Sequence, residues 1–559
     1  MRPRIFVPLC LALFVTASAW AQEPAPPREA EVPPPPAVEP PPLGWLPSLA
    51  ELEAAGAIIG EIRVEPQNIF DLSDPREDYL LYRLANALHI VTRPDLIRET
   101  LLFKSGERLS ARLVAESERL LRATLQIYGV RIRAVAYREG VVDLEVVTRD
   151  RWTLDPSVSF SRTGGVNTDR MGLKEDNLFG TGISVGFSRS SNVDRTSNTF
   201  NISHPHAFGP FTSASYSYSD TSDGRAWSLG VNRPFFALDS RTAWGASADS
   251  SLRAEPVYVS GVNTGTYQHQ QGRANVFGGA SKGLVDGWTR RHSIGLSYED
   301  NSYAAIPGQS PAGELPSDLV IAAPYYRYEM VQDRFRTGIN FDQIGKPEDF
   351  NVGLSLSVQL GRALAALGST RQQWLYSTSL AKAFDVGSRG LLQTNFSLSG
   401  RYSSRDEQQL SSLESRYFHR QNHGFTFFGS FRGSMVRYPD APNSLTLGGD
   451  NDLRGYPLRY QSGDKSVLVS LEERAYTDWY PFRLVRVGGA VFYDGGRAWG
   501  GSTPNTVNPG WLNDVGFGLR FLIDRSSKSN VLHVDLAFPL NREAGIDPVQ
   551  LLVYTKVTL

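Results

Sequence analysis

The sequence predicts a mainly β protein, in which a small α+β domain precedes a transmembrane antiparallel β-barrel. From residue 151 to residue 559 the chain consists of segments about ten residues long in which apolar and polar side chains alternate with a period of two. One such segment places four aliphatic side chains on a single face, namely Leu354, Leu356, Val358 and Leu360. Faces rich in aromatic residues oppose small polar faces, which is typical of strands that separate lipid from a polar lumen.

The number of strands follows less directly from the pattern. A soluble sandwich could show the same alternation, but in hydrocarbon every backbone N–H and C=O must be paired, so membrane strands must close into a barrel. We favour 16 strands, because we interpret segments such as 303–316 as long extracellular loops, and 18 to 20 are possible if hairpins such as 418–432 all form. The count should be even, with the N-terminal domain and the C-terminus both in the periplasm of a Gram-negative-type cell.

Charge and cysteine content exclude several classes of protein. The 559 residues include 57 basic and 58 acidic side chains, and this balance argues against a nucleic-acid partner. The single cysteine, Cys10, leaves no pair for a disulfide. After the first twenty residues, no apolar stretch reaches the roughly 18 residues that a spanning helix needs.

The first residues have the pattern of a secretory signal peptide over residues 1–21. Arg2 and Arg4 precede an apolar run, and Ala19-Trp20-Ala21 resembles a cleavage site. We therefore expect export to the outer membrane. Residues 22–57 are rich in proline at their start and are predicted to form a semi-rigid periplasmic linker; a recognition ligand is the less favoured alternative.

Residues 58–150 show the signals of a compact α+β domain. A strand is predicted over 58–64 and helices over 76–88, 95–103 and 110–125, the last with Ser110 as its N-cap. Two further strands, 130–137 and 141–148, flank the turn Arg138-Glu139-Gly140. The predicted barrel domain covers residues 151–559, and its alternating segments begin after Trp152.

Several motifs carry a family resemblance across residues 58–559. They are Glu175 to Gly182, Arg233-Pro234-Phe235-Phe236, Leu447-Gly448-Gly449, Leu453-Arg454-Gly455-Tyr456, Glu472, and Phe492-Tyr493-Asp494-Gly495-Gly496. These motifs resemble the BamA and TamA family of outer-membrane assembly barrels. The resemblance implies that the N-terminal domain is similar to one POTRA domain. It also implies contact between the sixth extracellular loop and the barrel wall, and a non-enzymatic role in the insertion or translocation of polypeptides.

The residues of this loop support a specific contact. The segment between Val436 and Lys465 is too long for a hairpin, so it can fold inward. Glu472 and Asp494 each lie on the polar face of an alternating segment and should face the lumen. We therefore expect Arg454 to bind Asp494 through its planar fork, with Glu472 nearby.

The neighbouring residues complete the predicted loop–lumen clamp. Gly455 would allow a tight backbone and Tyr456 would add a packing face, while the resemblance adds Phe492. The alternative is that residues 453–456 form an ordinary exposed turn.

Other polar residues give weaker signals. His204 and His206 lie on one side of an extended segment, but Pro205 and the lack of a third ligand favour a turn over a zinc site. His533 and Asp535 share a polar face, where a lumenal hydrogen bond is favoured over a catalytic pair. We expect no catalytic residue, cofactor or metal, and the expected partners are outer-membrane lipid with polypeptide clients or periplasmic proteins. The alternatives are a passive conduit for solutes or lipid and a hydrolase.

Overall fold

The computed structural model describes residues 46–259, 262–308, 315–341, 344, 347–403, 407–437, 445–449, 451–500, 510–523, 531–543 and 545–556. The signal-peptide prediction, most of the predicted linker and the tip of the predicted loop 303–316 lie outside these residues. Part of the predicted linker is folded, because Leu49–Ala54 form the helix α2. Ser48 caps this helix together with Glu51, and Leu52 is buried in the core that follows.

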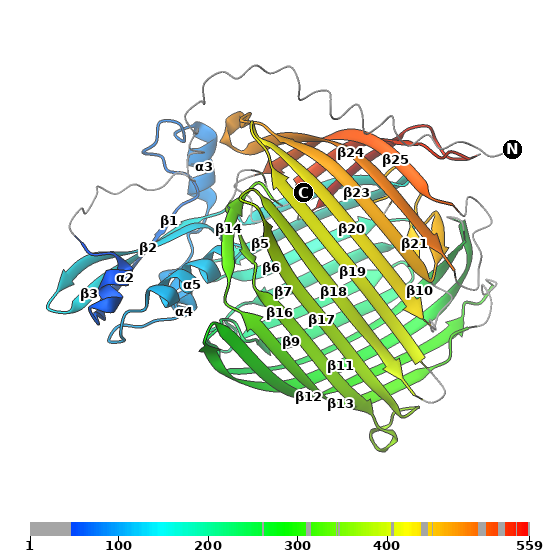
Figure 1. The fold of residues 1–559 in the computed structure, drawn as a ribbon, viewed down its shortest axis with the longest axis horizontal. Coiled ribbons are helices and arrows are strands. Elements are labelled where there is room, and N and C mark those ends of the chain that lie inside the picture. The colour runs from blue at the N-terminus through cyan, green and yellow to red at the C-terminus, as the bar shows by residue number, and fades with distance from the viewer. Residues whose placement is uncertain are drawn as a thin grey trace. The chain divides into compact units, whose positions relative to one another are not determined.

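A three-stranded sheet and its helices form an N-terminal module. Its strands are β1 (Ile58–Gln67), β2 (Ile127–Arg138) and β3 (Val141–Asp150), in the order β1-β3-β2. The helices are α3 (Leu80–Leu88), α4 (Pro94–Thr100) and α5 (Ala111–Arg122). Helices α4 and α5 lie beside the sheet (Figure 1). The sheet contributes the alternate residues Val142, Leu144 and Val146 to the apolar core that it shares with these helices.

Twenty strands close into the antiparallel barrel (Figure 1). They are β4 (Leu154–Thr163), β5 (Val166–Leu178), β6 (Ile183–Ser191), β7 (Thr196–His204), β8 (Ser213–Thr221), β9 (Gly224–Arg233), β10 (Thr242–Val259), β11 (Val262–Val285), β12 (Trp288–Ala305), β13 (Leu319–Gln332), β16 (Leu354–Ala363), β17 (Gln373–Val386), β18 (Gly390–Tyr402), β19 (Glu407–Arg420), β20 (Phe425–Arg437), β23 (Lys465–Tyr476), β24 (Val485–Trp499), β25 (Leu512–Ile523), β26 (Val531–Pro539) and β27 (Gln550–Lys556).

The favoured count of 16 strands is therefore wrong, whereas the upper limit of 20 agrees with the structure. Short turns such as Asp286-Gly287 join strands that the sequence pattern does not separate clearly. Tyr303 to Ala305 also belong to β12 rather than to the predicted loop. Because β10, β11 and β12 have 18, 24 and 18 residues, strand ends do not coincide with the period of about ten that the sequence suggests.

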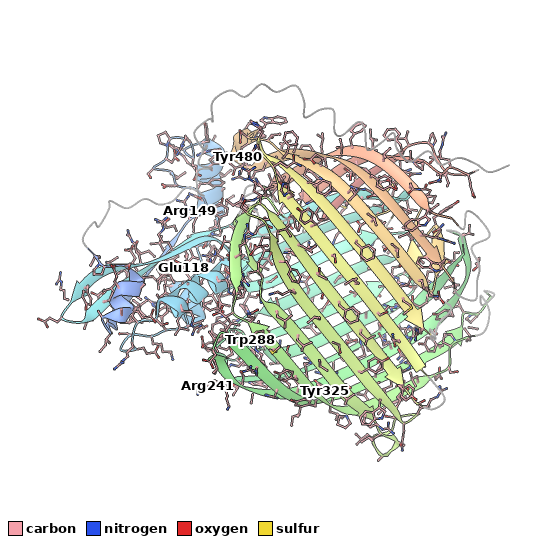
Figure 2. All side chains as sticks on the ribbon, in the orientation of Figure 1. Glu118, Arg149, Arg241, Trp288, Tyr325 and Tyr480 are labelled. Atoms are coloured by element: carbon pink, nitrogen blue, oxygen red, sulfur yellow. The ribbon has the colours of Figure 1, made fainter. Side chains whose placement is uncertain are left out.

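The two faces of the barrel wall differ in chemistry. On β25 the exposed side chains are Val515, Phe517, Leu519 and Ile523, while Asp514 and Arg520 on the other face are buried. Side chains cover both faces of the wall (Figure 2). An apolar outer face of this kind matches hydrocarbon, so the polar face lines the lumen of an outer-membrane barrel. Among the described residues, no helix is long and apolar enough to cross a membrane.

Consecutive strands reverse direction, which assigns each connection to one of two ends. The module end is the end at which β4 begins, and the opposite end carries the segment between β20 and β23. Two small sheets lie in these connections: β14 (Phe335–Ile339) pairs with β15 (Pro347–Asn351) at the module end, and β21 (Leu445–Leu447) pairs with β22 (Gln461–Gly463) at the opposite end.

Candidate functional site

A cluster of charged side chains joins the segment between β21 and β22 to the inner face of the barrel wall. Arg454 belongs to that segment, Glu472 to β23, and Phe492 and Asp494 to β24. All four side chains are buried. The alternation of β23 and β24 explains why these wall residues share the inner face, since Leu471 and Val491 on the outer face are exposed.

Arg454 binds Asp494 through a two-pronged contact. The guanidinium donates from Nε to Oδ2 at 2.7 Å and from Nη2 to Oδ1 at 2.9 Å. The guanidinium lies over the ring of Phe492, with Cζ of Arg454 3.4 Å from the ring centre. Ser470 adds a hydrogen bond from its hydroxyl to Oδ1 of Asp494 at 2.6 Å. Such a planar, bidentate contact fixes both the position and the orientation of the arginine.

Two further carboxylates surround the same guanidinium. Oε1 of Glu472 lies 2.8 Å from Nη1 of Arg454, and Oδ2 of Asp535 lies 3.5 Å from the same nitrogen. The other oxygen of Glu472 accepts a hydrogen bond from Nε of Arg474 at 2.8 Å. Asp535 also pairs with Arg520 and accepts a hydrogen bond from the Tyr554 hydroxyl at 2.9 Å. Neighbouring arginines thus balance part of the charge that buried acids would otherwise leave uncompensated.

Gly455 and Tyr456 hold the backbone of this segment against β25. The Gly455 N–H donates to Oδ2 of Asp514 at 2.9 Å, and an added Cβ would lie only 2.5 Å from Cβ of Asp514. Glycine is therefore required for close approach. The Tyr456 hydroxyl donates to the carbonyl of Asn513 at 2.9 Å and can accept from the N–H of Asn541 at 3.3 Å.

Sequence reasoning missed several members of the cluster. Asp514, Arg520 and Arg474 were not singled out, and Asp535 was considered only with His533. No local sequence signal marks Asp514, because its place in the cluster follows from the β24–β25 register, in which it pairs with Asp494. His533 is buried and stacks on Tyr554 with ring centres 4.9 Å apart.

The hairpin at the module end reaches the same cluster. Phe341 follows β14 and packs with Phe350, Phe418 and Phe428, and its carbonyl accepts a hydrogen bond from Nη1 of Arg474 at 3.3 Å. Ile344 packs with Leu522 and Val531 of the β25–β26 wall. Connections from both ends of the barrel thus meet at Glu472 and Arg474.

The histidine pair has a different environment. The backbone N–H of His206 donates to Nδ1 of His204 at 2.9 Å. The ring Nδ1 of His206 lies 2.8 Å from Oε2 of Glu99. In the part of the chain that the structure describes, no group of three or more His, Cys, Asp or Glu side chains could hold a metal ion.

This chain has low similarity to known proteins. No family model matches it, and no curated protein does. BamA from Haemophilus ducreyi lacking POTRA domains 1-3 matches with 14% identity and a TM-score of 0.38, over 89% of this chain and 84% of that chain. CdiB from Escherichia coli matches with 13% identity and a TM-score of 0.47, over 89% and 76%.

The copper transporter OprC also matches, with 10% identity and a TM-score of 0.37, over 76% of this chain and 73% of that chain. These matches concern the fold alone. All identities and TM-scores are low, and BamA and OprC match about equally well, so none of these matches assigns a function to this chain.

Proposed function

We propose that this chain is a non-enzymatic outer-membrane barrel that assists the insertion or translocation of polypeptides. The observation that carries the proposal is the seam between β27 and β4. Among the described residues this seam contains one residue pair, Val553 with Arg162. In contrast, all 18 residues of β10 pair with β11.

A seam with few backbone pairs, as this one has among the residues described, is a place where a barrel can accept another strand. Backbone groups without a partner are costly in hydrocarbon, so a client strand that supplies partners would be stabilised there. The single pair lies near the end of β4 that is farther from the module, because Arg162 is the second-last residue of that strand. The part of β4 nearer the module is therefore the proposed entry for a client.

We further propose that residues 445–463 fold into the barrel and are clamped there by Arg454, Gly455 and Tyr456 together with Glu472, Phe492 and Asp494. The bidentate Arg454–Asp494 contact supports this arrangement. The same segment touches the first strands, because the Leu458 N–H donates to the carbonyl of Gly164 at 3.2 Å. The loop would thus hold the two sides of the seam together at the end away from the module.

For the N-terminal module, residues 58–150, we propose a POTRA-like role in the periplasm. Its sheet has the order β1-β3-β2, so β1 and β2 are edge strands. An edge strand can bind an extended peptide through backbone hydrogen bonds. The module would present a client to the seam.

A disulfide across the seam tests the proposal. Cysteines at Arg162 and Val553 replace the Cα partners of the seam, and a matched control places cysteines at Ser377 and Ser399, which are partners in the β17–β18 wall. We expect the oxidised seam variant to lose client delivery and to recover it on reduction, while the oxidised wall variant stays active. Client delivery is measured by photo-crosslinking from β4 and by the level of other outer-membrane proteins.

Equal activity of the oxidised and reduced seam variants would contradict the proposal. Steady single-channel conductance in the purified barrel, with no crosslinked client and no change in other outer-membrane proteins, would instead indicate the passive conduit.

A further inference from the structure

One helix of the module exposes a face of leucines. Leu80, Leu81, Leu84 and Leu88 of α3 are 84%, 62%, 55% and 68% exposed. Residues 80, 84 and 88 repeat every four positions, so their side chains lie on one side of the helix. We call these four residues the leucine face. An apolar patch of this kind on a folded surface marks an interaction site.

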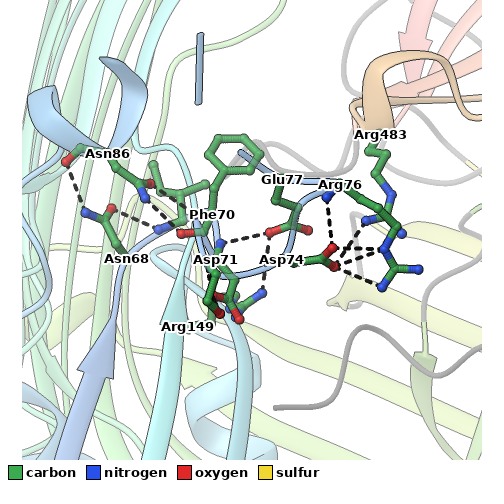
Figure 3. Close-up of polar contacts among 11 residues, drawn as sticks. Asn68, Phe70, Asp71, Asp74, Arg76, Glu77, Asn86, Arg149 and Arg483 are labelled. Atoms are coloured by element: carbon green, nitrogen blue, oxygen red, sulfur yellow. Dashed lines mark hydrogen bonds and ion pairs between the residues drawn. The ribbon is translucent and has the colours of Figure 1, made fainter. Parts of the chain in front are cut away.

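The opposite side of α3 is fixed to the rest of the protein. Tyr82 is buried and stacks on Phe70 with ring centres 4.2 Å apart. Asn86 exchanges hydrogen bonds with the backbone of Phe70, at 3.1 Å from its N–H and 2.8 Å to its carbonyl (Figure 3). The helix is therefore held in one orientation, and the leucine face is directed outward.

The helix is also anchored to the module end of the barrel. The cluster around Tyr82 includes Trp152, just before β4, and Leu484, just before β24. The Tyr82 hydroxyl donates to the carbonyl of Phe482. Nη1 of Arg483 lies 3.7 Å from Oδ2 of Asp74, in the segment that leads to α3 (Figure 3). These contacts join α3 to the turn between β23 and β24.

That turn has the composition of a membrane boundary. Trp479 and Phe482 are 65% and 81% exposed. Tyr480, between them in the sequence, is labelled in Figure 2. Aromatic residues concentrate where the apolar belt of a membrane barrel meets the headgroups. The outward side chains Leu471 of β23 and Val491 of β24 belong to that belt and are exposed. The leucine face is thus attached to the boundary between the lipid-facing wall and water.

We propose that the leucine face of α3 inserts into the lipid leaflet at the module end of the barrel, as an interfacial helix that anchors the module to the membrane. Lipid is the favoured occupant because α3 is continuous with the lipid-facing wall through the turn 477–484. The charges around α3 are balanced and give no basic surface for anionic headgroups: the acids Asp71, Asp74, Glu77 and Asp78 are paired with Arg76, Arg83, Arg149 and Arg483. Apolar burial therefore drives the contact, unlike that of basic helices that bind anionic lipid.

The test measures contact between lipid and the leucine face in the full-length barrel. In a Cys10→Ser background, Leu84→Cys carries an environment-sensitive fluorophore, and the protein is reconstituted in phosphatidylcholine vesicles with or without doxyl-labelled phosphatidylcholine. We expect blue-shifted emission and strong quenching by the doxyl lipid. The control is Asp95→Cys on α4, whose side chain is exposed on the same module, and it should show neither effect.

Two further arms complete the experiment. Adding Leu80→Ser and Leu88→Ser to the labelled protein should abolish most of the quenching without unfolding the barrel, because both side chains are exposed. Quenching should be unchanged by high salt or by the addition of anionic lipid. Equal quenching at positions 84 and 95 would overturn the proposal, and so would blue-shifted emission without lipid quenching, which would indicate a protein occupant such as a second copy.

Discussion

Two arginine–carboxylate clusters of this protein have similar nitrogen–oxygen distances but differ in how far their side chains are buried. In the barrel, Arg454 binds Asp494 at 2.7 Å, and the two side chains are 5% and 0% exposed. In the module, Arg76 binds Asp74 at 2.9 Å, and the two side chains are 69% and 19% exposed. Burial, rather than contact distance, should therefore decide how much stability is lost when one partner of the pair is removed.

The physical reason is the cost of an unpaired charge. When Arg454 is removed, Asp494 remains in a site from which water is largely excluded, and such a carboxylate is strongly destabilising. When Arg76 is removed, water solvates Asp74, so the loss is small. The barrel cluster should therefore be essential to the loop segment, and the module cluster should be dispensable.

The largest expected effect is that of Arg454→Ala. Breaking a fully buried pair costs about 3 to 5 kcal/mol, and hydration of the lumen would reduce this value. We expect a lower unfolding temperature in heat-modifiability gels and faster proteolysis of residues 445–463. The control is Arg459→Ala in the same segment, because Arg459 pairs with Asp194 at 2.9 Å but both side chains are only partly buried. Equal effects of the two variants would contradict the comparison.

The second prediction separates pairing from charge. Asp494→Ala should destabilise the barrel about as much as Arg454→Ala, and the double variant should be little worse than either single variant, because the two residues act as one unit. Arg454→Lys should retain only part of the stability, since lysine keeps the positive charge but cannot form the planar, bidentate contact with the carboxylate. Strictly additive losses in urea unfolding of the barrel would show that the two side chains are not coupled.

The third prediction concerns Glu118, whose burial lies between the two extremes. Burial raises the pKa of its carboxyl above the ordinary value of 4.5, although the Ile132 N–H donates to it at 2.7 Å and Arg122 lies nearby. The folded state therefore binds the proton more tightly than the unfolded state, and stability falls as the pH rises above 4.5. At neutral pH, the backbone amides of β2 should exchange hydrogen more slowly in the Glu118→Gln variant than in the wild-type protein.

This gain should disappear below pH 4.5, where the carboxyl is protonated in both states. Hydrogen exchange of β2 peptides in the full chain measures it. Faster hydrogen exchange of β2 in the Glu118→Gln variant than in the wild-type protein at neutral pH would show that the charge of Glu118 is stabilising.

The smallest effect is expected for Asp74→Asn. Hydrogen bonds from Arg76 lower the pKa of Asp74 from 3.8 to about 2. The contribution of the charged form is complete above pH 3.8 and is lost as the pH falls through about 2. Because the site is solvated, hydrogen exchange of residues 68–90 should be nearly unchanged at neutral pH. A loss comparable to that of Arg454→Ala would remove the distinction between the two clusters.

Some of these features could be predicted from the sequence and others could not. The sequence placed Arg454 beside Asp494, and two hydrogen bonds join them in the structure. That expectation depended on the alternation of apolar and polar residues around Asp494 and on the residue types of the loop that contains Arg454. Asp514 was missed because its role depends on a neighbouring strand that brings it opposite Asp494. Phe341 was missed because nothing in the segment after β13 indicates that it reaches Arg474.

The alternating sequence is enough to predict a wall with one apolar and one polar face, because the alternation of side chains along a β-strand is a local property with a period of two. The sequence also indicated the α+β character of residues 58–150, although α3 begins at Leu80 rather than at Arg76. Tertiary structure was needed to establish the strand count of 20, the one seam pair seen among the described residues, and the meeting of two connections at Glu472 and Arg474. They depend on how distant strands align when the sheet closes, and the register between such strands is a property of the whole barrel rather than of any one segment.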